Sequence, residues 1–223
     1  RLHETHLDGV ARAVDIYRRT IGDHPTTAFN LVNVAAAAMT LGRDAQALAA
    51  LRESVAIFEK SYGGAEHPDM IGALMLLGHL TRKLGHPGES RDLLMRGLAI
   101  ARAAQNPMLT PEAFAIELAE TLLAAGDPRG ALDLLEPLAD RFAGEPDAAR
   151  RDLLRARALW LAEPAARPRA HELAESAERG YAALAADASL LPPVRAEHRA
   201  ALAETRTWLS DHAFYGMARS TSP

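Results

Sequence analysis

Three glycines stand at nearly equal spacing along the chain, and this repeat restricts the possible folds more than any other feature. Gly42, Gly85 and Gly126 lie 43 and 41 residues apart, and a weaker fourth turn is expected near Ala165. A self-similar period of 20–50 residues is typical of repeat proteins, in which each unit packs on its neighbours. The chain is therefore predicted to be a solenoid.

Small residues recur at fixed distances from these turns. Seven residues before the four turns stand Ala35, Gly78, Ala119 and Ala158, and five residues after them stand Ala47, Ser90, Ala131 and Ala170. Nine residues after the turns, large apolar residues dominate: Leu51, Leu94 and Leu135, with Ala174 in the fourth unit. Small side chains let two helices approach closely where they cross. At Gly78, which has alanine as its equivalent elsewhere, we expect Ala to be accepted and Leu to be rejected.

Each unit is expected to contain two helices joined by a tight turn. Apolar residues recur with helical spacing on both sides of each turn, and a proline, which the first turn of a helix tolerates, opens each unit. The predicted helices are 25–41 and 44–60, 68–84 and 87–104, 111–125 and 128–142, and 147–162 and 167–186.

Both ends of the chain depart from this pattern. Leu7, Val10, Val14, Tyr17 and Ile21 form one apolar stripe, so residues 4–20 resemble the second helix of a unit whose first helix would lie upstream. A last amphipathic helix follows Pro192-Pro193 and is expected to cap the repeats. The predicted organisation is one all-α, right-handed solenoid over 1–215: an orphan helix at 4–23, repeats at 24–66, 67–109 and 110–144, a degenerate repeat at 145–190 and a capping helix at 191–211. Residues 216–223 are expected to form a flexible tail.

Composition excludes several classes of partner. The 223 residues carry a formal net charge of −4, so there is no basic excess for a nucleic acid. No apolar stretch approaches the roughly 20 residues that a membrane-spanning helix needs. Cysteine is absent, which fits a reducing compartment, and a cytoplasmic location is expected.

No residue pattern for catalysis, cofactor binding or metal binding stands out. His171-Glu172 is followed by Glu175, where a zinc-protease helix would need a second histidine. Gly63-Gly64 lacks the further glycines and the lysine of a phosphate-binding loop. The chain is accordingly predicted to be no enzyme and to have no catalytic residues, cofactor or metal site.

One segment resembles a known family. Between Phe58 and Asp69, the pair Gly63-Gly64 precedes His67-Pro68, and this resembles the linker between tetratricopeptide repeats of the kinesin-light-chain variety. The resemblance covers roughly residues 4–190 and is strongest over 24–142. The C-terminal part, from Ala156-Arg157-Ala158-Leu159-Trp160 to Trp208-Leu209, resembles the end of repeat regions attached to bacterial serine/threonine kinases, notably myxobacterial ones.

The first resemblance implies a binding groove, because in this family the first helices of the repeats line the inner surface. The implied inward columns contain Val32, Ala36 and Met39, then Met75, His79 and Arg82, then Ile116, Glu120 and Leu123, with Phe29 beside the first set and Lys83 beside Arg82. We expect Arg82 to pair with an acidic residue of a ligand and Phe29 to supply affinity between hydrophobic anchors. The alternative is that these side chains pack against the orphan helix or the adjacent repeat.

Two functional hypotheses follow. The first is a non-catalytic scaffold that binds a peptide or partner domain in this groove, as a module of a larger bacterial signalling protein. The second is a regulatory sensor that binds a small ligand or its own upstream kinase or DNA-binding domain. Self-assembly through exposed repeat ends is a third alternative.

Overall fold

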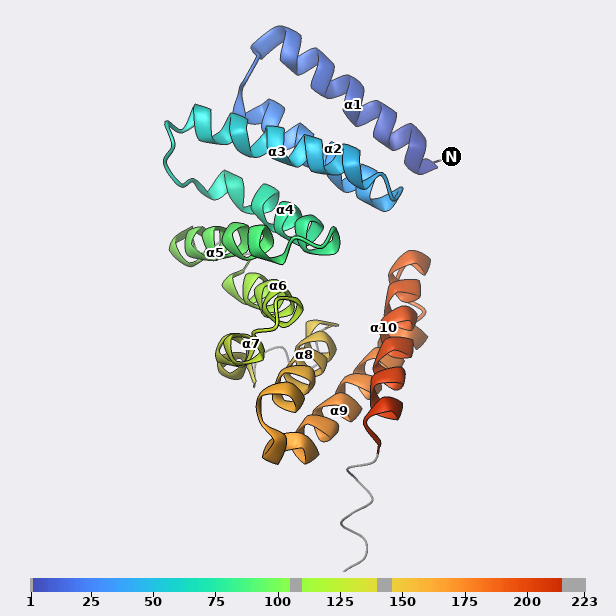
Figure 1. Cartoon of the computed structure of the whole chain (residues 1–223). Coiled ribbons are helices and arrows are strands. Elements are labelled where there is room, and N and C mark those ends of the chain that lie inside the picture. Colours follow the sequence, from blue (N-terminus) through green and yellow to red (C-terminus); the bar gives the residue numbers. More distant parts are fainter. Residues whose placement is uncertain (1, 105–109, 140–145, 214–223) are drawn as a thin grey trace, which may run out of the picture. The chain divides into compact units, whose positions relative to one another are not determined.

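The computed structural model describes residues 2–104, 110–139 and 146–213, and within these ranges the chain is helical without any strand (Figure 1). This confirms the predicted all-α repeat fold. The α-helices are α1 (Leu2–Ile21), α2 (Pro25–Thr40), α3 (Asp44–Ser61), α4 (Ile71–Lys83), α5 (Pro87–Ala104), α6 (Pro111–Ala124), α7 (Pro128–Leu135), α8 (Pro146–Ala162), α9 (Arg167–Ala186) and α10 (Pro192–Asp211). Short 3-10 turns occupy Pro68–Met70, Glu136–Leu138 and Pro164–Ala166. No helix of the described ranges combines the length and the apolar character needed to cross a bilayer.

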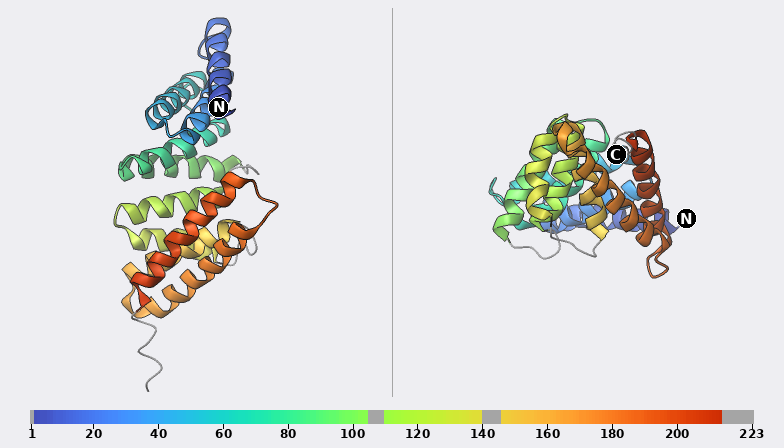
Figure 2. Two further views of the ribbon diagram at one scale, coloured as in Figure 1. Left: turned by 90° about the vertical axis from the view of Figure 1, so that its right-hand side faces the viewer. Right: turned by 90° about the horizontal axis from the view of Figure 1, so that it is seen from below.

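Contacts divide the chain into two compact units, Arg1–Thr121 and Leu122–Pro223. The first unit holds the helix pairs α2–α3 and α4–α5, with α1 packed beside α2 (Figures 1 and 2). The second unit holds α7 to α10. One continuous solenoid over residues 1–215 stays a prediction.

The three turn glycines share one geometry. Their φ angles are 68° at Gly42, 86° at Gly85 and 79° at Gly126, in the left-handed region that favours glycine. After each glycine, the next backbone N–H bonds the carbonyl five residues earlier: Arg43 to Ala38 at 2.8 Å, His86 to Thr81 at 2.9 Å and Asp127 to Leu122 at 2.8 Å. This hydrogen-bond pattern is the Schellman motif, and it ends the first helix of each of these three repeats in the same way.

Histidines as well as prolines stand at the starts of the first two repeats. The Nδ1 atom of His24 accepts a hydrogen bond from the N–H of Thr26 at 3.2 Å, and His67 accepts one from Asp69 at the same distance. Tyr62 stacks on His67 with ring centroids 3.8 Å apart and donates a hydrogen bond to Asp69. Burial, together with this bond to Asp69 and its charge, raises the pKa of Tyr62 to about 12.

The small columns lie at helix crossings, as predicted. Ala35, Ala119 and Ala158 are fully buried, and Gly78 is also buried. The expectation that Gly78 accepts Ala needs correction, however. A Cβ at Gly78 would lie 2.6 Å from Cγ of Leu94, which is too close for two carbon atoms. The contact reaches the branch point of the Leu94 side chain and not only its flexible end, so that side chain or the two helices would have to shift.

Two element boundaries differ from the sequence prediction. The helix expected at 128–142 ends at Leu135, because Pro137 cannot continue it, and Glu136–Leu138 form a 3-10 turn. The helix expected at 68–84 begins with the 3-10 turn Pro68–Met70 before α4. Residues 140–142 lie outside the described residues, as does the tail predicted at 216–223.

The second compact unit, Leu122–Pro223, has a core of its own. Ala149 and Leu153 of α8 pack with Ala177 and Tyr181 of α9, and Ala201 and Leu202 of α10 pack against this cluster. Trp160 meets Trp208 of α10 edge to face, with 5.5 Å between ring centroids. Figure 2 shows α10 running beside α9. These contacts support, within this unit, the predicted role of the last helix as a cover for α8 and α9.

Buried charge explains why the fourth repeat looked degenerate. Arg151 and Arg155 are 6% and 3% exposed, where a repeat helix normally carries apolar residues. Arg151 contacts Asp152 at 2.7 Å, and Arg155 contacts Glu136 at 3.0 Å. Arg157, in a column otherwise filled by Val or Leu, reaches Glu204 of α10 at 2.8 Å. Ion pairs thus replace apolar packing on part of α8.

Replacing Gly78 by Ala should lower the free energy of unfolding by about 1–3 kcal/mol, the usual cost of overpacking a helix crossing. Gly9 is a matched control, since it lies within α1 and an added Cβ meets nothing within 4 Å. Gly9→Ala should raise stability by about 0.5–1 kcal/mol through helix propensity alone. Urea denaturation of both variants measures the difference. If Gly78→Ala and Gly9→Ala changed the free energy of unfolding by the same amount, the α4–α5 crossing would be looser than described.

Deletion of residues 191–223 should expose the apolar side chains that α10 covers. We expect a lower melting temperature and self-association, because Tyr181 and Leu184 would lose their cover. A chain lacking only residues 214–223 is the control and should behave as the parent. Differential scanning calorimetry and sedimentation velocity provide the readouts, and an unchanged shorter chain would contradict the capping role.

Candidate functional site

The exposed face of α2 carries four of the predicted groove residues. Phe29 is 45% exposed, Ala36 is exposed, and Val32 and Met39 are half-buried. The ring of Phe29 rests edge-on against Phe58, with 5.1 Å between centroids. No residue of α2 from Pro25 to Thr40 is charged. The face is therefore an uncharged strip, on which the polar residues Asn33 and Thr40 are also exposed, with one partly exposed aromatic ring held by a buried one.

The predicted residues of α4 lie in different environments. Met75 is 8% exposed and belongs to the core. One turn of helix further on, the His79 side chain is 37% exposed. The Arg82 side chain is only 15% exposed. Of these three residues, His79 is the one that solvent reaches most easily.

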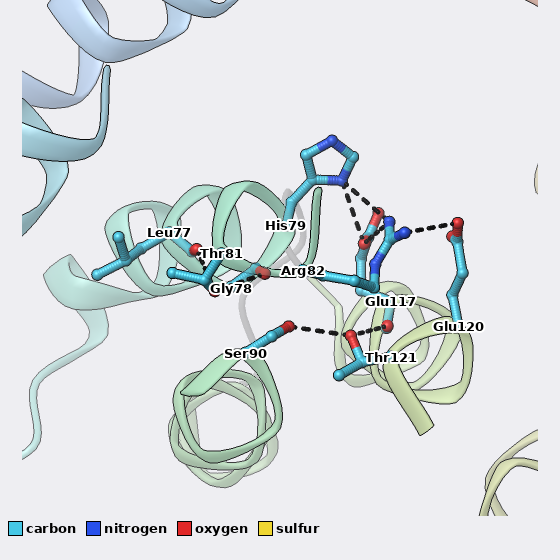
Figure 3. A network of polar contacts seen from close by, with 9 residues as sticks. All are labelled: Leu77, Gly78, His79, Thr81, Arg82, Ser90, Glu117, Glu120 and Thr121. Atoms are coloured by element: carbon cyan, nitrogen blue, oxygen red, sulfur yellow. Dashed lines mark hydrogen bonds and ion pairs between the residues drawn. The ribbon is translucent and has the colours of Figure 1, made fainter. Parts of the chain in front are cut away.

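A network of charged side chains joins α4 to α6 (Figure 3). Arg82 lies 2.9 Å from a carboxylate oxygen of Glu120 and 3.4 Å from one of Glu117. His79 Nδ1 lies 3.3 Å from the same Glu117 oxygen. Two carboxylates of the chain itself therefore surround the guanidinium that was expected to bind an acidic ligand residue. A ligand carboxylate would have to displace one of them and would be repelled by the other.

A buried hydroxyl pair lies beneath this network. The hydroxyl oxygens of Ser90 and Thr121 are 3.0 Å apart, and Thr121 donates to the backbone carbonyl of Glu117 at 3.0 Å (Figure 3). Glu117 is 9% exposed. Sequence reasoning missed Glu117 and Thr121. The available signal was the spacing of Glu117 and Glu120, three residues apart on α6 and therefore on one helix face.

The remaining predicted residues do not join Arg82 at one surface. Ile116 is 1% exposed, so it is a core residue of α6. Lys83 pairs with Asp44 at the start of α3, at 2.9 Å, and so is directed to the preceding repeat. Leu123 is half-buried and falls in the second compact unit. The structure thus brings together His79, Arg82 and Glu120, with the uncharged strip on α2 in the same compact unit.

A hollow lies between α1 and α2. Its volume is about 410 Å³, and it is open to solvent. The residues lining it, here called the α1–α2 hollow, are His6 and Val10 from α1 and Asn33, Ala36, Ala37 and Thr40 from α2. Ala36 is the one predicted groove residue among them.

Arg82→Met should destabilise the fold by about 1–3 kcal/mol, because the nearly buried Glu117 carboxylate would lose its cationic neighbour. The adjacent Lys83→Met makes a matched control. Its ion pair with Asp44 is half exposed and should be worth about 0–1 kcal/mol. Guanidinium denaturation in buffers of equal ionic strength compares the two. A larger loss for Lys83 than for Arg82 would contradict the network as described.

Comparisons with known proteins agree with this architecture. Residues 30–103 match the tetratricopeptide repeat family. This chain is similar in structure to a variant of a Podosopora anserina protein. The crystal structure of that variant is described as one of kinesin light chain nearly identical TPR-like repeats. The variant is 25% identical over 81% of this chain and 87% of its own, with a TM-score of 0.66. A second crystal structure of that protein is 24% identical in sequence and has a TM-score of 0.64. The match covers 83% of this chain and 90% of the other. No curated protein matches the sequence. Residues 30–103 are therefore similar to tetratricopeptide repeats, and the chain has the all-α repeat fold seen in these TPR-like structures.

Proposed function

We propose that this chain is a non-catalytic interaction module that binds a protein segment along the exposed face of α2 and the neighbouring part of α4. Tetratricopeptide repeats generally mediate contacts between proteins. The observation that supports the site best is the uncharged face of α2, on which Phe29 is 45% exposed. An aromatic side chain that is partly exposed and backed by a second ring is a suitable anchor for a partner.

The polar contacts of α4 change the ligand that this site should prefer. The positive charge of Arg82 is already balanced by Glu117 and Glu120. An acidic ligand residue would therefore gain little there and would approach two carboxylates. His79, which is 37% exposed, can still form a hydrogen bond with a neutral group. We therefore propose a ligand with apolar anchors and an uncharged polar centre, in place of the acidic centre expected from the sequence.

The wider setting rests on sequence resemblance. The likeness of the C-terminal part to kinase-associated repeat regions supports a module of a bacterial signalling protein in the cytoplasm, and this is proposed on that ground alone. The partner is proposed to be a protein or peptide, or another domain of the same polypeptide, and not a nucleic acid or a membrane. The regulatory-sensor alternative stays a prediction from the sequence.

Selection from a random peptide library displayed on phage supplies ligands for a direct test. Isothermal titration calorimetry of the selected peptide should show at least about tenfold weaker binding to Phe29→Ala, since a buried aromatic anchor is worth more than about 1.4 kcal/mol. Met95→Ala is the matched control, because Met95 is a large apolar residue of α5 that is 54% exposed. It should bind within about twofold of the parent.

Circular dichroism must first show that Phe29→Ala keeps its fold, because Phe29 packs on Phe58. Arg82→Gln should reduce binding of a neutral peptide far less than Phe29→Ala does. If Met95→Ala weakens binding and Phe29→Ala does not, the partner uses the second helices of the repeats and the proposed site is wrong.

A further inference from the structure

A second hollow lies beside the C-terminal end of α5. Its volume is about 270 Å³, it is open to solvent, and it is called the α5 hollow here. Its lining residues are Ala99, Ile100, Ala103 and Ala104 from α5, with Glu66 and Pro68 from the linker and turn before α4. In Figure 1 this end of α5 lies at the same edge as the linker from α3 to α4. The hollow therefore has an apolar wall and one carboxylate among its lining residues.

The corresponding place one repeat earlier is built from similar residues. A shift of 43 residues, the distance between the first two turn glycines, relates the two places. It pairs the lining residues with Asp23, Pro25, Ala56, Ile57, Lys60 and Ser61. Ile57 and Ile100 are buried alike, at 5% and 4% exposed. The largest difference is at Ala103, which has Lys60 as its equivalent. The α5 hollow thus lies where the second repeat lacks a long side chain.

Lys60 shows how a lysine occupies this place. Its Nζ atom contacts a carboxylate oxygen of Asp23 at 2.6 Å, so its side chain joins α3 to the linker before α2. Asp23 corresponds to Glu66, and Lys60 corresponds to Ala103. Because an alanine side chain ends at Cβ, Ala103 cannot make the same bridge to Glu66. The first repeat therefore provides a template for a ligand of the α5 hollow, namely an alkyl chain that ends in a cation.

The charges beside the α5 hollow favour a cation. Arg96 of α5 contacts Oε1 of Glu66 at 2.6 Å and Oε1 of Glu59 at 2.6 Å, so one guanidinium lies between two carboxylates. With both carboxylates ionised, negative charge exceeds positive charge in this group by one. The side chain of Glu66 is 50% exposed, so a second cation has access to its carboxylate from solvent. A ligand carboxylate would be repelled there.

We propose that the α5 hollow binds a lysine side chain of a protein partner. The methylene groups of that lysine lie against the alanines of α5, and its ammonium group pairs with Glu66. The sequence contains two lysines, Lys60 and Lys83, and both of them are already paired with an aspartate. Residues 105–109, which follow α5, contain no cationic side chain. Charge complementarity therefore favours a partner over the neighbouring chain as the source of the cation.

The lysine site is separate from the face of α2 proposed above. The lining residues of the α5 hollow all lie between residues 66 and 104, whereas Phe29 is carried by α2. Phe29→Ala should therefore leave lysine binding unchanged. Failure of either proposal leaves the other intact, because each rests on different residues.

A blocked lysine, Nα-acetyl-lysine N-methylamide, is the probe, because its blocked ends imitate a lysine within a polypeptide. Titrated into the isotope-labelled chain, it should shift the backbone amide NMR signals of Glu66, Ala99, Ala103 and Ala104 with one saturable concentration dependence. The norleucine analogue has the same carbon chain without the ammonium group. It should bind about threefold more weakly, a difference within the range of an exposed ion pair.

Two pairs of variants locate the binding. Glu66→Gln should bind the lysine probe about threefold more weakly than the parent. Asp23→Asn removes the equivalent carboxylate of the first repeat and should bind as the parent does. Ala103→Lys places a lysine where the first repeat has Lys60, so it should fill the hollow and abolish the shifts. Ala45→Lys, the same change at an exposed position of α3, should leave them unchanged.

Three results would overturn the proposal. If no amide signal around the α5 hollow moves, the hollow is closed to a lysine. If the norleucine analogue binds as tightly as the lysine probe, or if Glu66→Gln binds as the parent does, the carboxylate has no part in recognition. If Ala45→Lys abolishes the shifts as Ala103→Lys does, the lysine binds elsewhere.

Discussion

The close crossing of the two helices within each repeat is the contact on which the other features depend. In the second repeat, Gly78 of α4 lies so near Leu94 of α5 that a single added carbon would overlap its side chain. The tight turn at Gly85 returns the chain at the angle that this crossing needs. Because the same small columns recur, the same close crossing can form within each helix pair.

This crossing also decides which residues remain available to a partner. The face of α2 that carries Ala28 and Ala35 is used for packing, so Phe29 and Ala36 are left on the outer side. The uncharged strip of α2 thus follows from the geometry of the repeat.

The repeat period correctly predicted nearly every helix and the positions of the tight turns. Spacing within one helix also showed correctly that His79 and Arg82 share a face. It could not show what meets them, because the partners Glu117 and Glu120 stand 35 or more residues away and become neighbours only when α4 and α6 stack. The burial of Ile116 and the pairing of Lys83 with Asp44 were missed for the same reason. At Gly78, alanine in the other repeats suggested more room than Leu94 leaves.

A double-mutant cycle between Gly78 and Leu94 tests the central contact most directly. Leu94→Ala alone should destabilise the chain by about 2–5 kcal/mol as a large-to-small core change, and Gly78→Ala by about 1–3 kcal/mol. If the two side chains compete for one space, the combined variant should lose at least about 1 kcal/mol less than the sum of the single losses, measured by urea denaturation. Losses that add within about 0.5 kcal/mol would mean that the two positions do not touch, and that the crossing does not hold the repeat together as described.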